Sequence, residues 1–166
     1  RQIHGVNPGV AMVFQSFALF PWLTVVENVM LGLERKKMST EMKKEKSMQV
    51  LDIVGLDGFE NAYPKELSGG MRQRVVIAIA LSCDPDLLIC DEPTTALDVT
   101  VQAKILKLIR ELKEKTGVSF VFISHDLGVV AGVADRVAIM YAGKIIEIGT
   151  CHDIFYTPAH PYTRAL

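Results

Sequence analysis

The 166-residue sequence has no long hydrophobic run. Its longest candidate, residues 75–81, is far shorter than the roughly 18 apolar residues that a membrane-spanning helix needs. Net charge is also nearly absent, because 18 Lys and Arg residues stand against 19 Asp and Glu residues. A chain with this balance lacks the strongly basic surface that binding to a nucleic-acid backbone favours. The sequence therefore argues against a membrane span and a nucleic-acid partner, but it allows a protein partner in the membrane.

Cysteine is scarce as well. Cys83, Cys90 and Cys151 are scattered and form no C-x-x-C pair, which fits a reducing compartment better than a disulfide framework. Cys90 lies in an apolar run and is typical of a small core residue. The N-terminus has no secretory signal pattern and begins at Arg1 instead of Met, so we expect the sequence to start inside a longer protein.

Short apolar runs alternate with segments of helical periodicity, which predicts an α/β fold. Buried strands are predicted over residues 9–14, 87–90 and 118–123, and a β-hairpin over residues 136–148. Helices are predicted over residues 24–31, 40–54, 71–82, 101–116 and 126–134. Because strands and helices alternate through the middle of the chain, the sheet should be mainly parallel.

Three parts are expected along the chain. Residues 1–15 and about 76–150 should form the core sheet, and residues 16 to about 75 should form a helical subdomain beside it. Residues 151–166 remain as a C-terminal extension.

Two acidic residues follow the predicted strand 87–90. Asp91 and Glu92 would emerge at the carboxyl end of this strand, where α/β sheets bind ligands. An Asp there can hold Mg²⁺, which bridges nucleotide phosphates, and an adjacent Glu could orient or deprotonate an attacking water. Two solvated acids before a proline turn would give the same pattern, so both interpretations stay open.

A serine and two glycines precede the predicted helix 71–82. Gly69 and Gly70 would let the backbone approach a ligand closely, and the helix N-terminus after Ser68 would present N–H groups suited to phosphate. Taken alone, the pattern is better explained by a helix cap after a flexible turn.

Polar residues also follow the predicted strand 118–123. From Ser124-His125-Asp126, His125 could reach a terminal phosphate. A lone histidine is more often structural than catalytic, but two successive strands that end in polar groups at one edge favour a functional role.

Five motifs stand in the order and rough spacing of the ABC ATPase family. They are Gln15 after an apolar strand, Leu67-Ser68-Gly69-Gly70-Met71, the strand 87–91 with Glu92, Thr95-Ala96-Leu97-Asp98, and His125. They resemble the Q-loop, signature, Walker B strand with catalytic glutamate, D-loop and switch histidine of that family. The chain is thus similar to an ABC transporter ATP-binding subunit over essentially its whole length. The implied fold is a P-loop NTPase-like, mainly parallel sheet with an inserted helical subdomain.

The resemblance implies a role for each residue near the phosphates. Asp91 resembles the Mg²⁺ ligand, and Glu92 resembles the residue that polarises the attacking water. His125 resembles the contact to the γ-phosphate of ATP. Gln15 resembles the residue that senses metal and water and couples them to the membrane partner.

A second group implies that two subunits are needed. Ser68, Gly69 and Gly70 resemble residues that contact ATP held by the opposite subunit of a head-to-tail dimer. Asp98 resembles a residue of the loop that crosses the same interface.

One family motif is missing from the sequence. No G-x-x-x-x-G-K-[ST] occurs in the 166 residues, so the Walker A loop that cradles the phosphates is absent from them. In the family this loop precedes the Q-loop glutamine, so we expect it upstream of Arg1, together with the aromatic residue that stacks on adenine.

Two branches of the family are suggested by different segments. The segment from Glu92 to Asp98 (EPTTALD) and residues 159–166 (AHPYTRAL) resemble the oligopeptide, dipeptide and nickel importers. Residues 14–29 look more like amino-acid, osmolyte or inorganic-anion importers. The substrate class stays open, with peptides ahead. The aromatic residues Phe17, Phe20 and Trp22 are interpreted as a packing surface for a membrane subunit.

Three functions compete. The leading hypothesis is an ATP-hydrolysing importer subunit, peripheral on the cytoplasmic face of the membrane, with ATP and Mg²⁺, transmembrane permease subunits and a second ATP-binding subunit. A soluble ABC ATPase of DNA repair or translation would add coiled coils, a second cassette or basic extensions, and the sequence shows none. The third is a truncated, non-catalytic cassette that serves as an interaction module, although Glu92 and His125 argue against degeneration of the parent protein.

The 166-residue chain by itself is predicted neither to bind ATP tightly nor to hydrolyse it. Removing even one preorganised donor costs on the order of 10²–10³ in rate, and here an entire phosphate cradle is absent. Phosphate release from Mg-ATP should therefore stay at background. Turnover by the isolated chain that Glu92→Gln abolishes would contradict this expectation.

Overall fold

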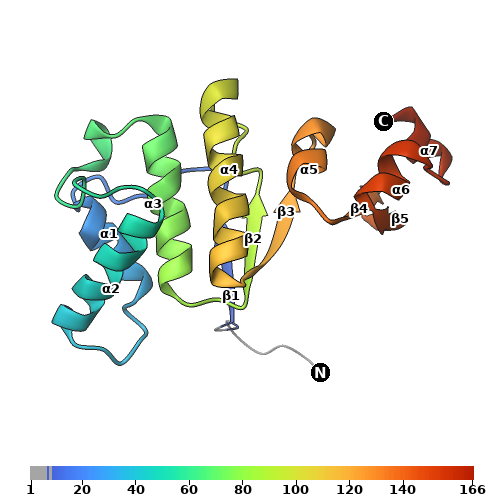
Figure 1. Ribbon diagram of the computed structural model, residues 1–166. Helices are drawn as coiled ribbons and strands as arrows, with labels where there is room; N and C mark the ends of the chain where they lie inside the picture. The colour runs from blue at the N-terminus through green and yellow to red at the C-terminus, as the bar shows by residue number, and fades with distance from the viewer. Residues whose placement is uncertain (1–6, 8) are drawn as a thin grey trace. The chain divides into compact units, whose positions relative to one another are not determined.

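The computed structural model describes residue 7 and residues 9–166 (Figure 1). It contains two compact units, which divide between Ile123 and Ser124. The expected division into core sheet, helical subdomain and extension follows other boundaries and stays a prediction. Among the described residues, no helix is both long and apolar enough to span a membrane.

The first unit is built on a parallel sheet of three strands, in the order β1-β2-β3. These are β1 (Val10–Val13), β2 (Leu87–Asp91) and β3 (Ser119–Ile123). The register pairs Val13 with Cys90 and Asp91 with Ile123, so the segments that follow the strands leave at one edge of the sheet. The predicted α/β fold with a parallel sheet is confirmed.

Helices fill both connections of this sheet. Between β1 and β2 lie α1 (Val25–Gly32), α2 (Thr40–Ile53), a 3-10 helix (Pro64–Glu66) and α3 (Gly69–Ser82), and α4 (Val99–Thr116) joins β2 to β3. The predicted cap of α1 is confirmed, because the Thr24 hydroxyl accepts a hydrogen bond from the Glu27 N–H. Gly117 ends α4 in the left-handed conformation, as expected for a helix stop. The 3-10 helix was not predicted.

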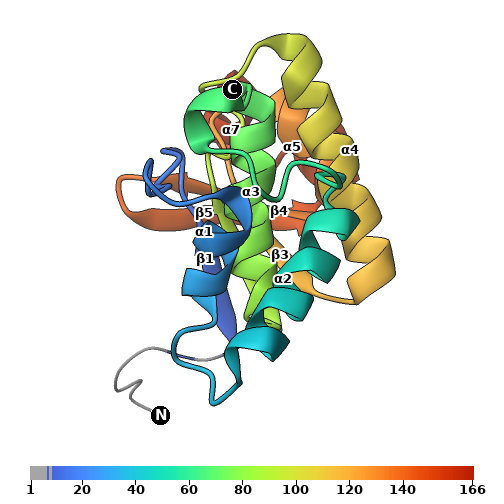
Figure 2. The same ribbon diagram turned by 90° about the vertical axis from the view of Figure 1, so that its left-hand side faces the viewer.

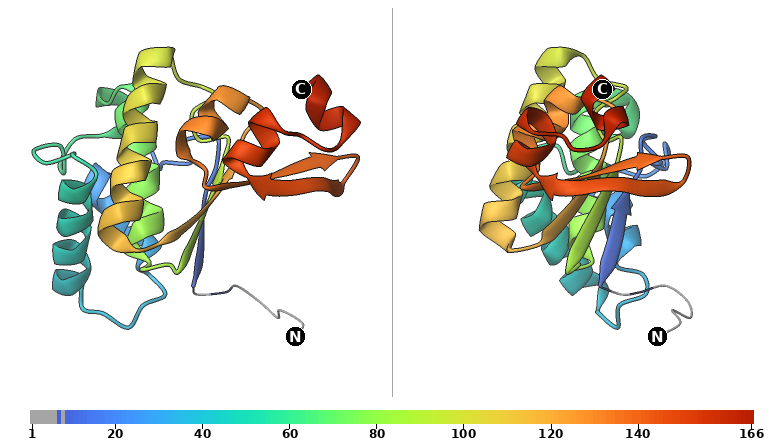
Figure 3. Two further views of the ribbon diagram at one scale, coloured as in Figure 1. Left: turned by 45° about the vertical axis from the view of Figure 1, so that its right-hand side comes forward. Right: turned by 90° about the vertical axis from the view of Figure 1, so that its right-hand side faces the viewer.

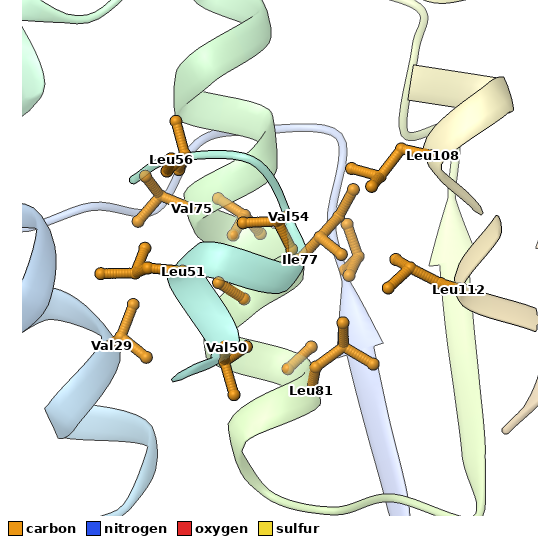
Figure 4. Packing of buried hydrophobic residues seen from close by; sticks show 14 of the residues in the cluster. Val29, Val50, Leu51, Val54, Leu56, Val75, Ile77, Leu81, Leu108 and Leu112 are labelled. Carbon is orange, nitrogen blue, oxygen red and sulfur yellow. The ribbon is translucent and has the colours of Figure 1, made fainter. Parts of the chain in front are cut away.

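One hydrophobic core holds this unit together, and it lies between the helices and one face of the sheet (Figures 2 and 4). Leu51 from α2, Ile77 from α3 and Leu112 from α4 are fully buried and lie in one cluster (Figure 4). Leu88 and Cys90 of β2 belong to the same cluster. Each such aliphatic side chain contributes roughly 1.5–3 kcal/mol when it is buried, so this core fixes the strand that carries the acidic pair.

The second unit is a β-hairpin with short helices (Figure 3). Its elements are α5 (Leu127–Val133), β4 (Arg136–Tyr141), β5 (Lys144–Thr150), α6 (Cys151–Tyr156) and α7 (Pro161–Ala165). The predicted hairpin is confirmed, and Ala142 and Gly143 both adopt positive φ (47° and 76°), as a type I′ turn requires. Val137, Ile139 and Ile154 form its own small core.

A buried asparagine, Asn28, holds the loop between β1 and α1, which covers residues 14–24. Asn28 is 1% exposed. Its Oδ1 accepts from the Phe20 N–H at 2.8 Å, and its Nδ2 donates to the carbonyl oxygens of Phe20, Leu23 and Thr24 at 3.2, 3.1 and 2.9 Å. One side chain thus pairs four backbone groups of a segment that has no regular structure of its own.

Replacing Asn28 with Ala should therefore destabilise the first unit. The change removes the partners of the Phe20 N–H and the Leu23 carbonyl, while the carbonyls of Phe20 and Thr24 still accept backbone N–H groups. We therefore expect the free energy of unfolding to fall by about 1–3 kcal/mol. Urea denaturation followed by the far-ultraviolet circular dichroism of the helices measures it. Asn61→Ala removes an exposed amide and should stay within about 0.5 kcal/mol of wild type. Equal stability of the two variants would show that the Asn28 network contributes nothing.

Candidate functional site

A shallow cavity, open to solvent, lies at the edge where β1 and β2 end. Its volume is about 540 Å³, and it brings together two of the predicted site residues, Gln15 and Asp91. Gln15 comes from the loop after β1, and Asp91 is the last residue of β2. The remaining lining residues are Phe14, Ser16, Phe17 and Ala96.

The donor chemistry of this cavity fits magnesium. Mg²⁺ takes oxygen ligands and usually combines one or two protein groups with water and substrate phosphates. The Asp91 carboxylate and the Gln15 amide oxygen meet that description. Within residues 7 and 9–166, no group of three or more His, Cys, Asp or Glu side chains could hold a metal ion by itself. A cation here would therefore need further oxygen atoms from water or from a bound ligand.

Glu92 adopts an unusual backbone conformation next to this cavity. Its φ is +45°, a left-handed value that costs a residue with a Cβ roughly 1–2 kcal/mol. Two hydrogen bonds hold it there, because its N–H donates to the Ile123 carbonyl at 3.0 Å and its Oε2 accepts from the Thr95 hydroxyl at 3.1 Å. Strained residues gather at functional sites, but Asp84 and Ala142 also have positive φ, so the role of Glu92 stays a prediction.

Ser68 and Asp98 both act as helix caps. The Ser68 hydroxyl accepts from the Met71 N–H at 3.3 Å, and the Asp98 carboxylate accepts from the Val101 N–H at 3.0 Å. The cap at Ser68 moves the start of α3 to Gly69, two residues before the predicted start. Gly69 lies close to Leu97, so the structure brings the serine-glycine segment and the segment that ends in Asp98 together in one unit.

His125 belongs to the second unit. It is exposed and follows Ile123, the β3 residue that pairs with Asp91, by two positions along the chain. The roles predicted for it and for the other site residues stay predictions.

Two residues of α3, Arg72 and Gln73, were not identified as notable from the sequence. Arg72 contacts the loop that follows β1. The Arg72 guanidinium carbon lies 5.4 Å from the centre of the Phe17 ring, a cation–π distance. Gln73 is 1% exposed, and in the described part of the chain its amide nitrogen and oxygen have no hydrogen-bond partner. The only available signal was the presence of Arg and Gln on a helix that is otherwise apolar.

Cys90 precedes Asp91 but takes no part in the cavity. Its thiol is fully buried, and burial raises its pKa to about 12. It therefore stays protonated and serves as a small core side chain, as its sequence context predicted.

Known proteins with similar sequences include two peptide-transport ATP-binding proteins. Dipeptide transport ATP-binding protein DppD of Bacillus subtilis (strain 168) is 55% identical over 100% of this chain and 51% of its own length. Oligopeptide transport ATP-binding protein OppD of the same organism is 52% identical over 95% of this chain and 46% of its own length. The chain thus spans about half the length of these curated relatives.

Solved structures share the fold. cbiO1 from Clostridium perfringens, part of the ABC transporter complex cbiONQ, matches 90% of this chain and 60% of its own, with TM-score 0.83 and 28% identity. The dimeric ATP-binding cassette MJ0796, solved in a post-hydrolysis state with ADP and Pi, matches 86% and 62%, with TM-score 0.70 and 34% identity. The predicted cassette fold is confirmed. The sequence pattern of the ABC transporter family matches residues 1–95, and this chain belongs to that family.

Proposed function

We propose that this chain is the ATP-binding and ATP-hydrolysing part of an importer for short peptides. The observation that carries the proposal is the cavity that Gln15 and Asp91 share at the carboxyl edge of β2, with the strained Glu92 directly after it. Oxygen donors and a poised carboxylate at this edge suit a nucleotide triphosphate.

The residues of the first unit have separate tasks in this proposal. Asp91 and Gln15 would hold Mg²⁺, an ion that supplies charge neutralisation for the phosphate oxygens of ATP. Glu92 accepts a hydrogen bond from the attacking water and orients it, and Thr95 holds the carboxylate at the angle this requires. His125 would contact the γ-phosphate. Catalysis of this kind depends mainly on positioning the reactants, and the fixed backbone of Glu92 would help to hold the attacking water in place.

A second ATP-binding subunit completes the site. Ser68, Gly69 and Gly70 would contact ATP bound by the opposite subunit, and Asp98 would lie in the same interface. The dimeric state of the solved cassette MJ0796 supports this arrangement.

Peptides are the proposed cargo because both relatives are named for peptide transport. Their similarity covers 95–100% of this chain, including the segment 14–29 that resembles other importers. Transmembrane permease subunits are the proposed partners, at the cytoplasmic face of the membrane. Trp22 (69% exposed) and Phe20 (45% exposed) offer an aromatic surface for such a contact.

A direct test uses the complete natural gene product, assembled with its permease in lipid vesicles. Dipeptide should stimulate phosphate release from Mg-ATP. Glu92→Gln keeps the shape but removes the base, so we expect turnover to fall by roughly 10²–10⁴-fold while ATP binding persists.

Glu114→Gln is the matched control, since Glu114 is an exposed residue of α4 far along the helix from Asp98. It should leave turnover unchanged. Wild-type turnover by Glu92→Gln would remove Glu92 from the mechanism. A complete wild-type assembly that hydrolyses no ATP would favour the non-catalytic module instead.

A further inference from the structure

Gly70 is buried against α4 and has no room for a side chain. A Cβ on Gly70 would lie 2.5 Å from Cγ1 of Val101, a distance that real Cβ atoms essentially never show. The next atoms are Val101 Cβ at 3.8 Å and Cγ2 at 4.0 Å, which are ordinary contacts. The space at Gly70 is therefore closed by one methyl group of one residue.

The backbone of Gly70 does not itself require glycine. Gly70 is the second residue of α3, and helices favour alanine over glycine by roughly 1 kcal/mol in their interior. Local propensity thus predicts that Gly70→Ala would stabilise the chain. The contact with Val101 predicts that Gly70→Ala would destabilise the chain. Whether the variant is more or less stable than wild type therefore shows which influence dominates.

Val101 cannot easily turn its methyl group away. It is the third residue of α4, and a β-branched side chain in a helix has one strongly preferred rotamer. Its N–H donates to the Asp98 carboxylate at 3.0 Å, which ties the same residue to the helix cap. Moving Val101 would therefore move the backbone around Asp98.

Gly69 makes a similar approach on the other side of Asp98. A Cβ on Gly69 would lie 3.3 Å from Cδ2 of Leu97, a tight distance to the end of a flexible side chain. Leu97 and Val101 therefore flank Asp98, and the glycine pair packs against both. The helices α3 and α4 run side by side from this point (Figures 1 and 2).

We propose that Val101 is a positioning residue, which locks the segment Ser68-Gly69-Gly70 against the start of α4 within one subunit, and that this packing requires glycine at position 70. The inference rests on the proposed function, because it explains how Ser68 and Asp98 could reach the opposite subunit's nucleotide as one rigid group. Val101 itself touches no ligand in this proposal.

Thermal unfolding of the complete natural gene product, measured without nucleotide, tests the packing. Overpacking costs about 1–3 kcal/mol, and each kcal/mol shifts the midpoint by about 2–4 °C in a domain of 150–250 residues, so Gly70→Ala should lower the midpoint by roughly 2–12 °C. Adding Val101→Ala should restore most of that loss, because the nearest remaining atom of residue 101 would be Cβ at 3.8 Å. Val101→Ala alone should cost less than Gly70→Ala. Gly132→Ala in α5, where a Cβ meets nothing within 4 Å, should not lower the midpoint.

ATP turnover of the complete gene product with its permease tests the positioning. At a temperature where every variant is folded, a merely structural role would leave kcat unchanged. We expect Gly70→Ala to lower kcat by roughly 10–100-fold with a smaller change in KM, and the double variant to recover it.

Each possible result of these experiments either supports or contradicts the proposal. Recovery of the midpoint and of kcat in the double variant supports the proposal, and it does so even if Gly70→Ala alone fails to fold. A double variant as unstable as Gly70→Ala overturns the packing argument. If the double variant recovers the midpoint but not kcat, Val101 is not a positioning residue. Position 70 is then glycine because the nucleotide must approach its backbone closely. If the wild-type assembly has no turnover, the proposed function fails while the unfolding data still decide the packing.

Discussion

The parallel pairing of β2 with β1 and β3 is the constraint on which the site depends. Its register places Asp91 opposite Ile123, and the Ile123 carbonyl then accepts the Glu92 N–H. The loop that carries Gln15 leaves β1 at the same edge. A slip of one residue in β2 would turn Asp91 toward the core and Cys90 away from it. The buried face of the strand, with Leu88 and Cys90 fully enclosed, makes such a slip costly.

Capping is the second device that holds the site. Ser68 and Asp98 pair orphan N–H groups at the starts of α3 and α4, and both are also predicted to act at the interface with a second subunit. The two tasks do not exclude each other, because a cap uses one oxygen and leaves the other lone pairs of a hydroxyl or carboxylate available. A local structural role is therefore no argument against a functional one at these positions.

Local rules predicted the elements well. Thr24, Ser68 and Gly117 mark helix ends by chemistry that acts within one turn. Short continuous apolar runs identified β1, β2 and β3, and the Ala142-Gly143 turn identified the hairpin. Ordered motifs then gave the family. The sequence could not reveal the φ of Glu92, which depends on the pairing of β2 with β3. Nor could it reveal the Asn28 network or the contact of Gly70 with Val101, because both depend on distances between separate segments. The short helices α6 and α7 were missed, since each is too brief to show a helical period.

The strained backbone of Glu92 is held in place by the residues around it. A left-handed residue persists only where its surroundings over-determine it. Here one bond reaches to β3 through the Ile123 carbonyl, and two reach forward to Thr95, through its backbone N–H to the Glu92 carbonyl at 3.3 Å and through its hydroxyl to the Glu92 carboxylate. The sheet and the turn after it therefore share the cost of the strained backbone.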